Sequence, residues 1–259
     1  MRWRLTILLL ALLCACASND THNAGRSITI VAAADLKFAI DEAIQQFKAT
    51  NREIQTKAIY GSSGSFYAQI GNNGPFDMFL SADMEYPRKL VDAGLAIPGT
   101  EFNYAVGRLV VWVRKDSPID VERRGIDSLL DASVRKISIA NPDHAPYGRA
   151  AVFSMQKLNV YDKVKDRFVF GENVAQTLEF IDSGAAQIGI VAMSLAVAPT
   201  VQPLGRYAEL PLDSYPRMDQ GGVILKLVRD RAAADAFRSF LLADQGRAIL
   251  KRFGFYLPQ

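Results

Sequence analysis

Residues 27–48, SITIVAAADLKFAIDEAIQQFK, join a strand pattern directly to a helix pattern. Ser27–Ala33 is a continuous apolar run, which is typical of a parallel strand buried on both faces. Over Leu36–Lys48, apolar residues recur at helical spacing and form one stripe. Only Ala34 and Asp35 separate the two patterns. This short passage from strand to helix predicts a βα unit.

Strand and helix patterns continue to alternate along the rest of the chain. Repeated βα units predict the α/β fold class, with an open, mostly parallel sheet covered by helices on both faces. Further strands are expected at Ile54–Tyr60, Phe76–Leu80, Arg108–Val113, Lys136–Ala140, Ile188–Val191 and Val223–Val228. Further helices are expected at Phe66–Ile70, Asp83–Ala93, Arg149–Leu158, Ala175–Ser183, Ala232–Leu242 and Gly246–Phe253.

The composition is that of an ordinary globular protein. A chain of 259 residues allows one large domain or two lobes. Hydrophobic residues make up 49% and charged residues 22%, which excludes disorder, collagen and coiled coil as the main architecture. The formal charge of +3 is too small to favour nucleic acid as a partner. With 2 Cys and 2 His, a disulfide scaffold and a multi-Cys or multi-His metal site are excluded.

Residues 1–16 have the pattern of an export signal with a lipobox. Two arginines precede Leu5–Leu13, an apolar run too short to span a bilayer. Leu13–Cys16 (LCAC) resembles the lipobox of bacterial lipoproteins, with Cys16 as the residue that carries lipid, whereas Ala15–Ala17 fits ordinary signal cleavage. Residues 17–26 form a polar tether. Removing the two arginines lowers the formal charge from +3 to +1.

Four expected strand-to-helix junctions share small and capping residues. In open α/β sheets, ligands bind at the carboxyl ends of strands. A helix start offers unpaired N–H groups and partial positive charge, so it can hold an anion without a cation. One such junction is usually structural, because Ser, Asp and Asn are common helix caps. Several together indicate an anion-binding cleft; these junctions are Ala32–Leu36, Gly61–Ser65, Asn141–Arg149 and Gly171–Val174.

From about Ile28 to Leu257 the chain resembles the periplasmic molybdate-binding proteins of ABC transporters. PFDMFLSADMEYPRKLVDAGL is the most specific of the segments that carry this resemblance. The others are AAADLKFAIDEAIQQF, YGSSGSFYAQI, GRLVVWV, NPDHAPYGRAA, GENVAQTLEFIDSGAAQIGIV and RAILKRFGFYLP.

The resemblance implies a two-lobed periplasmic-binding-protein fold of type II. Each lobe is then a mostly parallel sheet flanked by helices, with the ligand in the cleft between the lobes. Residues 27–106 and 213–259 would form the first lobe, and residues 107–212 the second. The implied function is capture of a small oxyanion, molybdate or tungstate, in the periplasm. The expected partner is an ABC permease, and the lipid is the only membrane contact. The resemblance further implies a monomer with no catalysis, no cofactor and no bare metal ion.

Residue by residue, the resemblance assigns ligand contacts to Asp35, Ser63, Tyr147 and Val174. Two positions depart from the family pattern. Asp35 stands where the family has Ser, and Ala192 stands where the family has a Tyr hydroxyl. The Tyr147 hydroxyl is a candidate replacement from across the cleft. Residues expected to support these contacts are Ser62, Arg149 and Asn173.

Asp35 admits three interpretations. A carboxylate about 4 Å from one anionic charge costs on the order of 4 kcal/mol at an effective dielectric constant of about 20. Asp35 either caps its helix and faces away, or lines the cleft while protonated or offset by Lys37 or Arg149. In the third interpretation the ligand is not a simple dianion.

Three other functions stay open from the sequence. The same fold could bind a different small ligand, because both departures fall on ligand positions. An exported hydrolase would use Ser63 as nucleophile and His144 as base. A sensory module would dock a membrane receptor instead of a permease.

Overall fold

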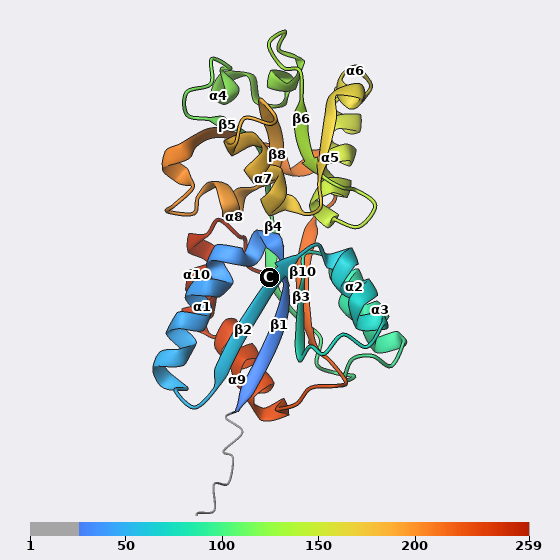
Figure 1. Cartoon of the computed structure of the whole chain (residues 1–259), viewed down its shortest axis with the longest axis vertical. Coiled ribbons are helices and arrows are strands. Elements are labelled where there is room, and N and C mark those ends of the chain that lie inside the picture. The colour runs from blue at the N-terminus through green and yellow to red at the C-terminus, as the bar shows by residue number, and fades with distance from the viewer. Residues whose placement is uncertain (1–25, 259) are drawn as a thin grey trace, which may run out of the picture.

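The computed structural model describes residues 26–258. The predicted signal peptide with its lipobox, lipidation of Cys16, and the tether up to residue 25 lie outside the described residues. Two α/β lobes are stacked along the longest axis of the molecule (Figure 1). No helix within the described part of the chain is long and apolar enough to cross a membrane.

The first lobe is built on a five-stranded sheet with the order β2-β1-β3-β10-β4. Its strands are β1 (Ser27–Ala33), β2 (Gln55–Gly61), β3 (Met78–Ser81), β4 (Phe102–Gly107) and β10 (Met218–Ile224). Its helices are α1 (Lys37–Thr50), α2 (Ser63–Gly71), α3 (Glu85–Asp92), α9 (Arg231–Leu242) and α10 (Asp244–Arg252).

The second lobe is built on a five-stranded sheet with the order β7-β6-β8-β5-β9. Its strands are β5 (Leu109–Arg114), β6 (Ile137–Ala140), β7 (Phe168–Gly171), β8 (Ile188–Ala192) and β9 (Gly205–Glu209). Its helices are α4 (Val121–Arg124), α5 (Pro146–Lys157), α6 (Tyr161–Val164), α7 (Val174–Asp182) and α8 (Met193–Ala196).

The two sheets have the same pattern of strand directions. In the first, β1 pairs in parallel with β2 and β3, and β10 runs antiparallel to both β3 and β4. In the second, β6 pairs in parallel with β7 and β8, and β5 runs antiparallel to both β8 and β9. The predicted parallel units are confirmed, and each sheet also contains one strand of opposite direction.

The antiparallel strands mark the places where the chain changes lobe. Only Arg108 separates β4 from β5, so the chain passes from the first sheet to the second almost without a loop. It returns through residues 210–217, which lead into β10 (Figure 1). The carboxyl ends of β1, β2 and β3 consequently face the second lobe.

The late strand was predicted wrongly at Val223–Val228. The strand runs instead over Met218–Ile224, and the chain turns at Lys226 and Leu227. Its first five residues contain Asp219, Gln220 and two glycines, a sequence that has no apolar strand pattern. Pairing with β3 on one side and β4 on the other makes this segment a strand despite its composition. Strands β4, β7 and β9 were also not predicted.

Candidate functional site

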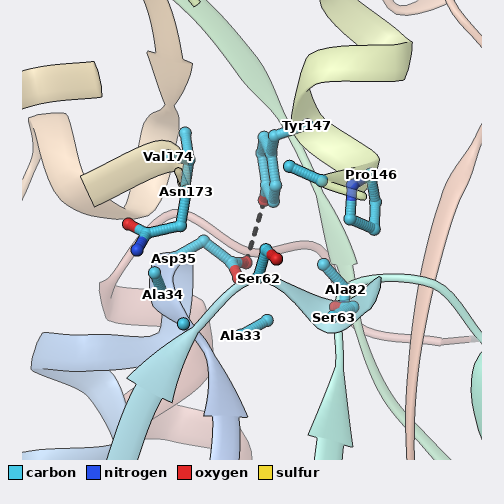
Figure 2. A pocket seen from close by; sticks show the side chains of 12 residues that line it. Ala33, Ala34, Asp35, Ser62, Ser63, Ala82, Pro146, Tyr147, Asn173 and Val174 are labelled. Atoms are coloured by element: carbon cyan, nitrogen blue, oxygen red, sulfur yellow. Dashed lines mark hydrogen bonds between the residues drawn. The ribbon is translucent and has the colours of Figure 1, made fainter. Parts of the chain in front are cut away.

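A cavity lies where the two lobes meet (Figure 2). The first lobe contributes the end of β1 with the following 3-10 turn Ala34–Leu36, the β2–α2 junction, and Ala82 after β3. The second lobe contributes the starts of α5 and α7. The lining residues are Ala33, Ala34, Asp35, Gly61, Ser62, Ser63, Ala82, Ala145, Pro146, Tyr147, Asn173 and Val174.

Three helices begin at this cavity. Ser63 is the first residue of α2, Tyr147 the second of α5, and Val174 the first of α7. The N–H groups in the first turn of a helix have no partner within that helix, and this end carries partial positive charge. Because three such ends meet in one small space, the site suits an anion even without a basic side chain.

Two of the lining polar side chains cap these helices. The Ser62 side chain accepts a hydrogen bond from the Ser65 N–H at 3.3 Å. Asn173 Oδ1 accepts from the N–H groups of Ala175 and Gln176 at 3.0 and 3.1 Å. Both residues therefore have the structural role of an N-cap in addition to their place at the cavity.

The Ser63 hydroxyl holds the first-lobe side of the cavity together. Ser63 is fully buried, and its Oγ accepts a hydrogen bond from the Ala82 N–H at 3.0 Å. This bond ties the start of α2 to the loop after β3. Because Oγ acts here as an acceptor, the hydroxyl proton is available for donation to a bound anion.

Asp35 faces the cavity and belongs to a buried cluster. Its Oδ2 accepts hydrogen bonds from Tyr147 Oη at 3.0 Å and from Gln220 Nε2 at 2.7 Å. Gln220 Nε2 also donates to Tyr147 Oη at 3.1 Å. The Tyr147–Asp35 bond joins the two lobes and is visible across the centre of Figure 2. A second bond between the lobes, at 2.7 Å, runs from Ser194 Oγ to the main-chain oxygen of Asp35.

Burial dominates the electrostatics of Asp35. The residue is 1% exposed, and burial raises the pKa of its carboxyl from 3.8 to about 6, although the bonds from Gln220 and Tyr147 oppose the rise. Neither cation considered above offsets its charge. Lys37 Nζ lies 3.9 Å from an Asp41 carboxylate oxygen, and Arg149 pairs with Asp83. The interpretation of Asp35 as an outward-facing cap does not match this geometry.

Two glycines permit the close approach of the lobes. A Cβ on Gly107 would lie 2.6 Å from Tyr147 Oη and 2.8 Å from Gln220 Nε2. A Cβ on Gly64 would lie 2.6 Å from the main-chain oxygen of His144, the atom that accepts the Gly64 N–H bond at 2.9 Å. Neither contact leaves room for a side chain.

Arg149 lies at the rim and is absent from the cavity lining. Its guanidinium donates to Asp83 Oδ2 at 2.9 Å and to Tyr86 Oη at 3.2 Å, and thereby links α5 of the second lobe to the first. A second rim contact joins Ser65 Oγ to Glu172 Oε1 at 2.8 Å. Arg149 thus supports closure of the cleft through its hydrogen bonds to Asp83 and Tyr86.

The cavity is small. The volume open to the centre of a water molecule is about 10 Å³, which is close to the minimum for one water. A tetrahedral oxyanion is larger than a water molecule, so this space has to widen to hold one.

The structure therefore brings six of the seven predicted site residues to one cavity and places Arg149 outside it. Ala192 is fully buried at the start of α8, and the hydroxyl nearest in sequence, that of Ser194, binds the Asp35 main chain. Sequence reasoning missed Gln220, Ser194 and Gly107. Gln220 escaped notice because its strand was placed too late in the chain.

The hydrolase arrangement has no geometric support. Ser63 Oγ bonds to the Ala82 N–H, whereas His144 Nε2 lies 3.0 Å from the main-chain oxygen of Glu172 and 3.1 Å from its carboxylate. A nucleophile and its base should contact each other. Among the described residues, no group of three or more His, Cys, Asp or Glu side chains could hold a metal ion.

Two α/β lobes with matching strand directions, closed over a cavity at their helix starts, define a two-lobed solute-binding protein. A model of the family described as bacterial extracellular solute-binding protein matches residues 28–256. The molybdate-binding protein ModA of Rhodobacter capsulatus is 38% identical over 196 residues, 76% of this chain and 75% of that protein.

ModA of Azotobacter vinelandii is 34% identical over 255 residues, 98% of this chain and 97% of that protein. The solved structure of the periplasmic molybdate-binding protein of A. vinelandii matches with a TM-score of 0.84 at 32% identity. This match covers 90% of this chain and 100% of that one. The chain belongs to the bacterial extracellular solute-binding proteins and, within them, to the ModA family. The resemblance and the two-lobed fold predicted from the sequence are confirmed.

Proposed function

We propose that this protein is the extracytoplasmic binding component of an ABC importer and that it captures a small oxyanion, molybdate or tungstate. The observation that carries the proposal is the convergence of the α2, α5 and α7 starts on one cavity. Donors fixed by the backbone suit a tetrahedral anion whose charge is spread over its oxygens. Membership of the ModA family supports molybdate and tungstate as the first ligands to test.

In this proposal Ser63, Tyr147 and Val174 provide the donors. Ser63 offers its hydroxyl and main-chain N–H, and the other two offer main-chain N–H groups from the opposite lobe. Asp35 lines the same space. The ligand would therefore be held by both lobes at once, which couples binding to closure.

The bodies that move would be residues 27–106 with 213–259, and residues 107–212. The small cavity supports such a motion, since the space has to widen to hold an oxyanion. After closure, the protein would pass the ligand to a membrane permease without covalent chemistry. The lipobox at Cys16 supports a periplasmic protein that is held at the membrane by lipid. The monomeric state in this proposal rests on the family resemblance alone.

Titration calorimetry of the full-length protein with molybdate, tungstate, sulfate and phosphate tests the proposal. Saturable binding of molybdate or tungstate at micromolar concentration is expected, and Ser63→Ala should weaken it by about tenfold through loss of one hydrogen bond. Ser183→Ala, a change at an exposed turn of the second lobe, is the matched control. Absence of binding for molybdate and tungstate would overturn the assignment of these ligands, and absence of binding for all four anions would overturn the oxyanion function.

A second candidate is a related protein of the same fold with a different small ligand. The buried Asp35 carboxylate favours it, because a negative charge in the cavity disfavours a simple dianion. The same calorimetric panel separates the candidates: preference for phosphate over molybdate and tungstate would indicate the second.

A further inference from the structure

The buried cluster around Asp35 has more hydrogen-bond acceptors than donors. Both donors that reach the carboxylate, Tyr147 Oη and Gln220 Nε2, go to Oδ2. Within residues 26–258, Asp35 Oδ1 is buried and has no hydrogen-bond partner, and the same holds for Gln220 Oε1. A buried acceptor without a donor carries a desolvation cost. One additional proton, which the ionised carboxylate does not provide, would complete the hydrogen bonding of the cluster.

Among the described residues, the polar groups recorded as interacting with Asp35 come from four elements, and none of these groups is a cation. Tyr147 comes from α5, Tyr104 from β4, Gln220 from β10 and Ser194 from α8. The charge of Asp35 raises the pKa of the Tyr147 and Tyr104 hydroxyls further above their usual range, which buried phenols already exceed. Both tyrosines therefore stay protonated and cannot serve as the missing acid.

A bound dianion would meet the ionised carboxylate at close range. Repulsion between unit charges about 4 Å apart lowers affinity by roughly a thousandfold at an effective dielectric constant of about 20. One proton placed between Asp35 and an oxygen of the anion removes this repulsion. It also supplies the donor that Oδ1 lacks.

We propose that the site binds an oxyanion together with one proton, which Asp35 Oδ1 and an anion oxygen share in a single hydrogen bond. This inference rests on the proposed oxyanion function and adds its ligand class: anions that either carry one proton or gain one on binding. Molybdate, tungstate and sulfate would take up a proton from solvent as they bind. Hydrogenphosphate would bring its own.

A pH dependence with a defined sign follows. In the empty site the pKa of Asp35 is about 6, so the carboxyl is largely protonated below that pH and ionised above it. A dianion that needs the proton should lose affinity by about tenfold for each pH unit above this value. Hydrogenphosphate should lose little affinity between pH 7 and pH 9, since its own proton fills the same position.

Calorimetry of the full-length protein from pH 5 to pH 9, in buffers of different ionisation enthalpy, tests the inference. For the dianion that binds, uptake of nearly one proton is expected at pH 8. Asp35→Asn should abolish the uptake and flatten the pH profile, because the amide supplies a donor at every pH. Tyr147→Phe removes one donor from Oδ2 and should move the onset of the affinity loss to higher pH.

The matched control is Asp143→Asn, which neutralises an exposed carboxylate on the loop before α5 and should leave the slope unchanged. Binding of a dianion without proton uptake, with the same flat profile in wild type and Asp35→Asn, would overturn the inference and leave the oxyanion function intact. Failure of every anion to bind between pH 5 and pH 9 would overturn the function itself. The two failures are thus distinguishable.

Discussion

Two sets of contacts close the cleft, and they differ in burial and in charge. The inner set joins Asp35, Tyr147 and Gln220 in a fully enclosed cluster with no cation. The outer set joins Arg149 to Asp83 at the rim, where 39% and 31% of these side chains are exposed. Both sets link the same two lobes.

The difference separates contacts that set specificity from contacts that assist closure. In the buried cluster, protonation of Asp35 changes the free energy of the folded protein by several kilocalories per mole, because water cannot screen the ionised carboxylate. At the rim, water and salt screen the ion pair, so its net contribution is small even though it involves two full charges. We therefore expect the cluster of Asp35, Tyr147 and Gln220 to have a larger effect on stability and specificity than the ion pair between Arg149 and Asp83.

Asp35→Asn gives the largest expected effect. Its pKa rise from 3.8 to about 6 corresponds to about 3 kcal/mol of lost stability when the carboxyl is ionised. The folded protein holds this proton between about pH 4 and pH 6 and the unfolded chain does not, so wild-type stability falls as pH rises through that window. The variant should thus be more stable than wild type by up to about 3 kcal/mol at pH 8, and nearly equal to it at pH 4.

Urea denaturation of the ligand-free proteins at both pH values measures this difference. Asp143→Asn, at an exposed site, should show no gain. Equal stability of wild type and Asp35→Asn at pH 8 would contradict the view that the inner cluster contains an uncompensated charge, and the comparison of the two sets would fail.

Gly107→Ala tests the packing of the inner set instead of its charge. The added Cβ would press against Tyr147 Oη and Gln220 Nε2 at once, so both side chains have to move away from Asp35. We expect a loss of about 2 kcal/mol in the free energy of unfolding, in the usual range for overpacking. Gly71→Ala is the control, because a Cβ there meets nothing within 4 Å. An equal effect of the two changes would show that the inner set is loosely packed.

The inner set also shows how far the sequence could predict this site. The family resemblance assigned Asp35, Ser63, Tyr147 and Val174 as ligand contacts. The first three also lie at junctions that follow a strand predicted from its apolar residues, whereas the strand before Val174 was not predicted. At such a junction, the local sequence pattern predicts the strand and also the end of the strand at which a ligand binds. The strand Ser27–Ala33 was predicted with its exact ends for the same reason.

Gln220 and Gly107 could not be found in this way. Both lie on the strands next to the lobe crossings, where partners far away in the sequence decide the structure. Met218–Ile224 is a strand because β3 and β4 pair with it, and its polar first half gives no local signal. The sequence around Gly107 does not indicate that a side chain is excluded there. The reason is the Tyr147 side chain of the other lobe, which lies against this glycine in the structure. Tertiary pairing overrides local propensity at both positions.

The rim ion pair gives the smallest expected effect and completes the comparison. Removing Arg149 and Asp83 singly and together, as Arg149→Met and Asp83→Asn, isolates their coupling energy in a double-mutant cycle. Because both side chains are about one-third exposed, the coupling should be below about 1 kcal/mol and should shrink further in 1 M salt. The bond from Arg149 to Tyr86 Oη is lost in every variant that lacks Arg149, so it cancels from the cycle. A salt-insensitive coupling as large as the Asp35→Asn effect would mean that the rim is effectively buried in solution, and that charge at the rim governs closure as strongly as the proton at Asp35.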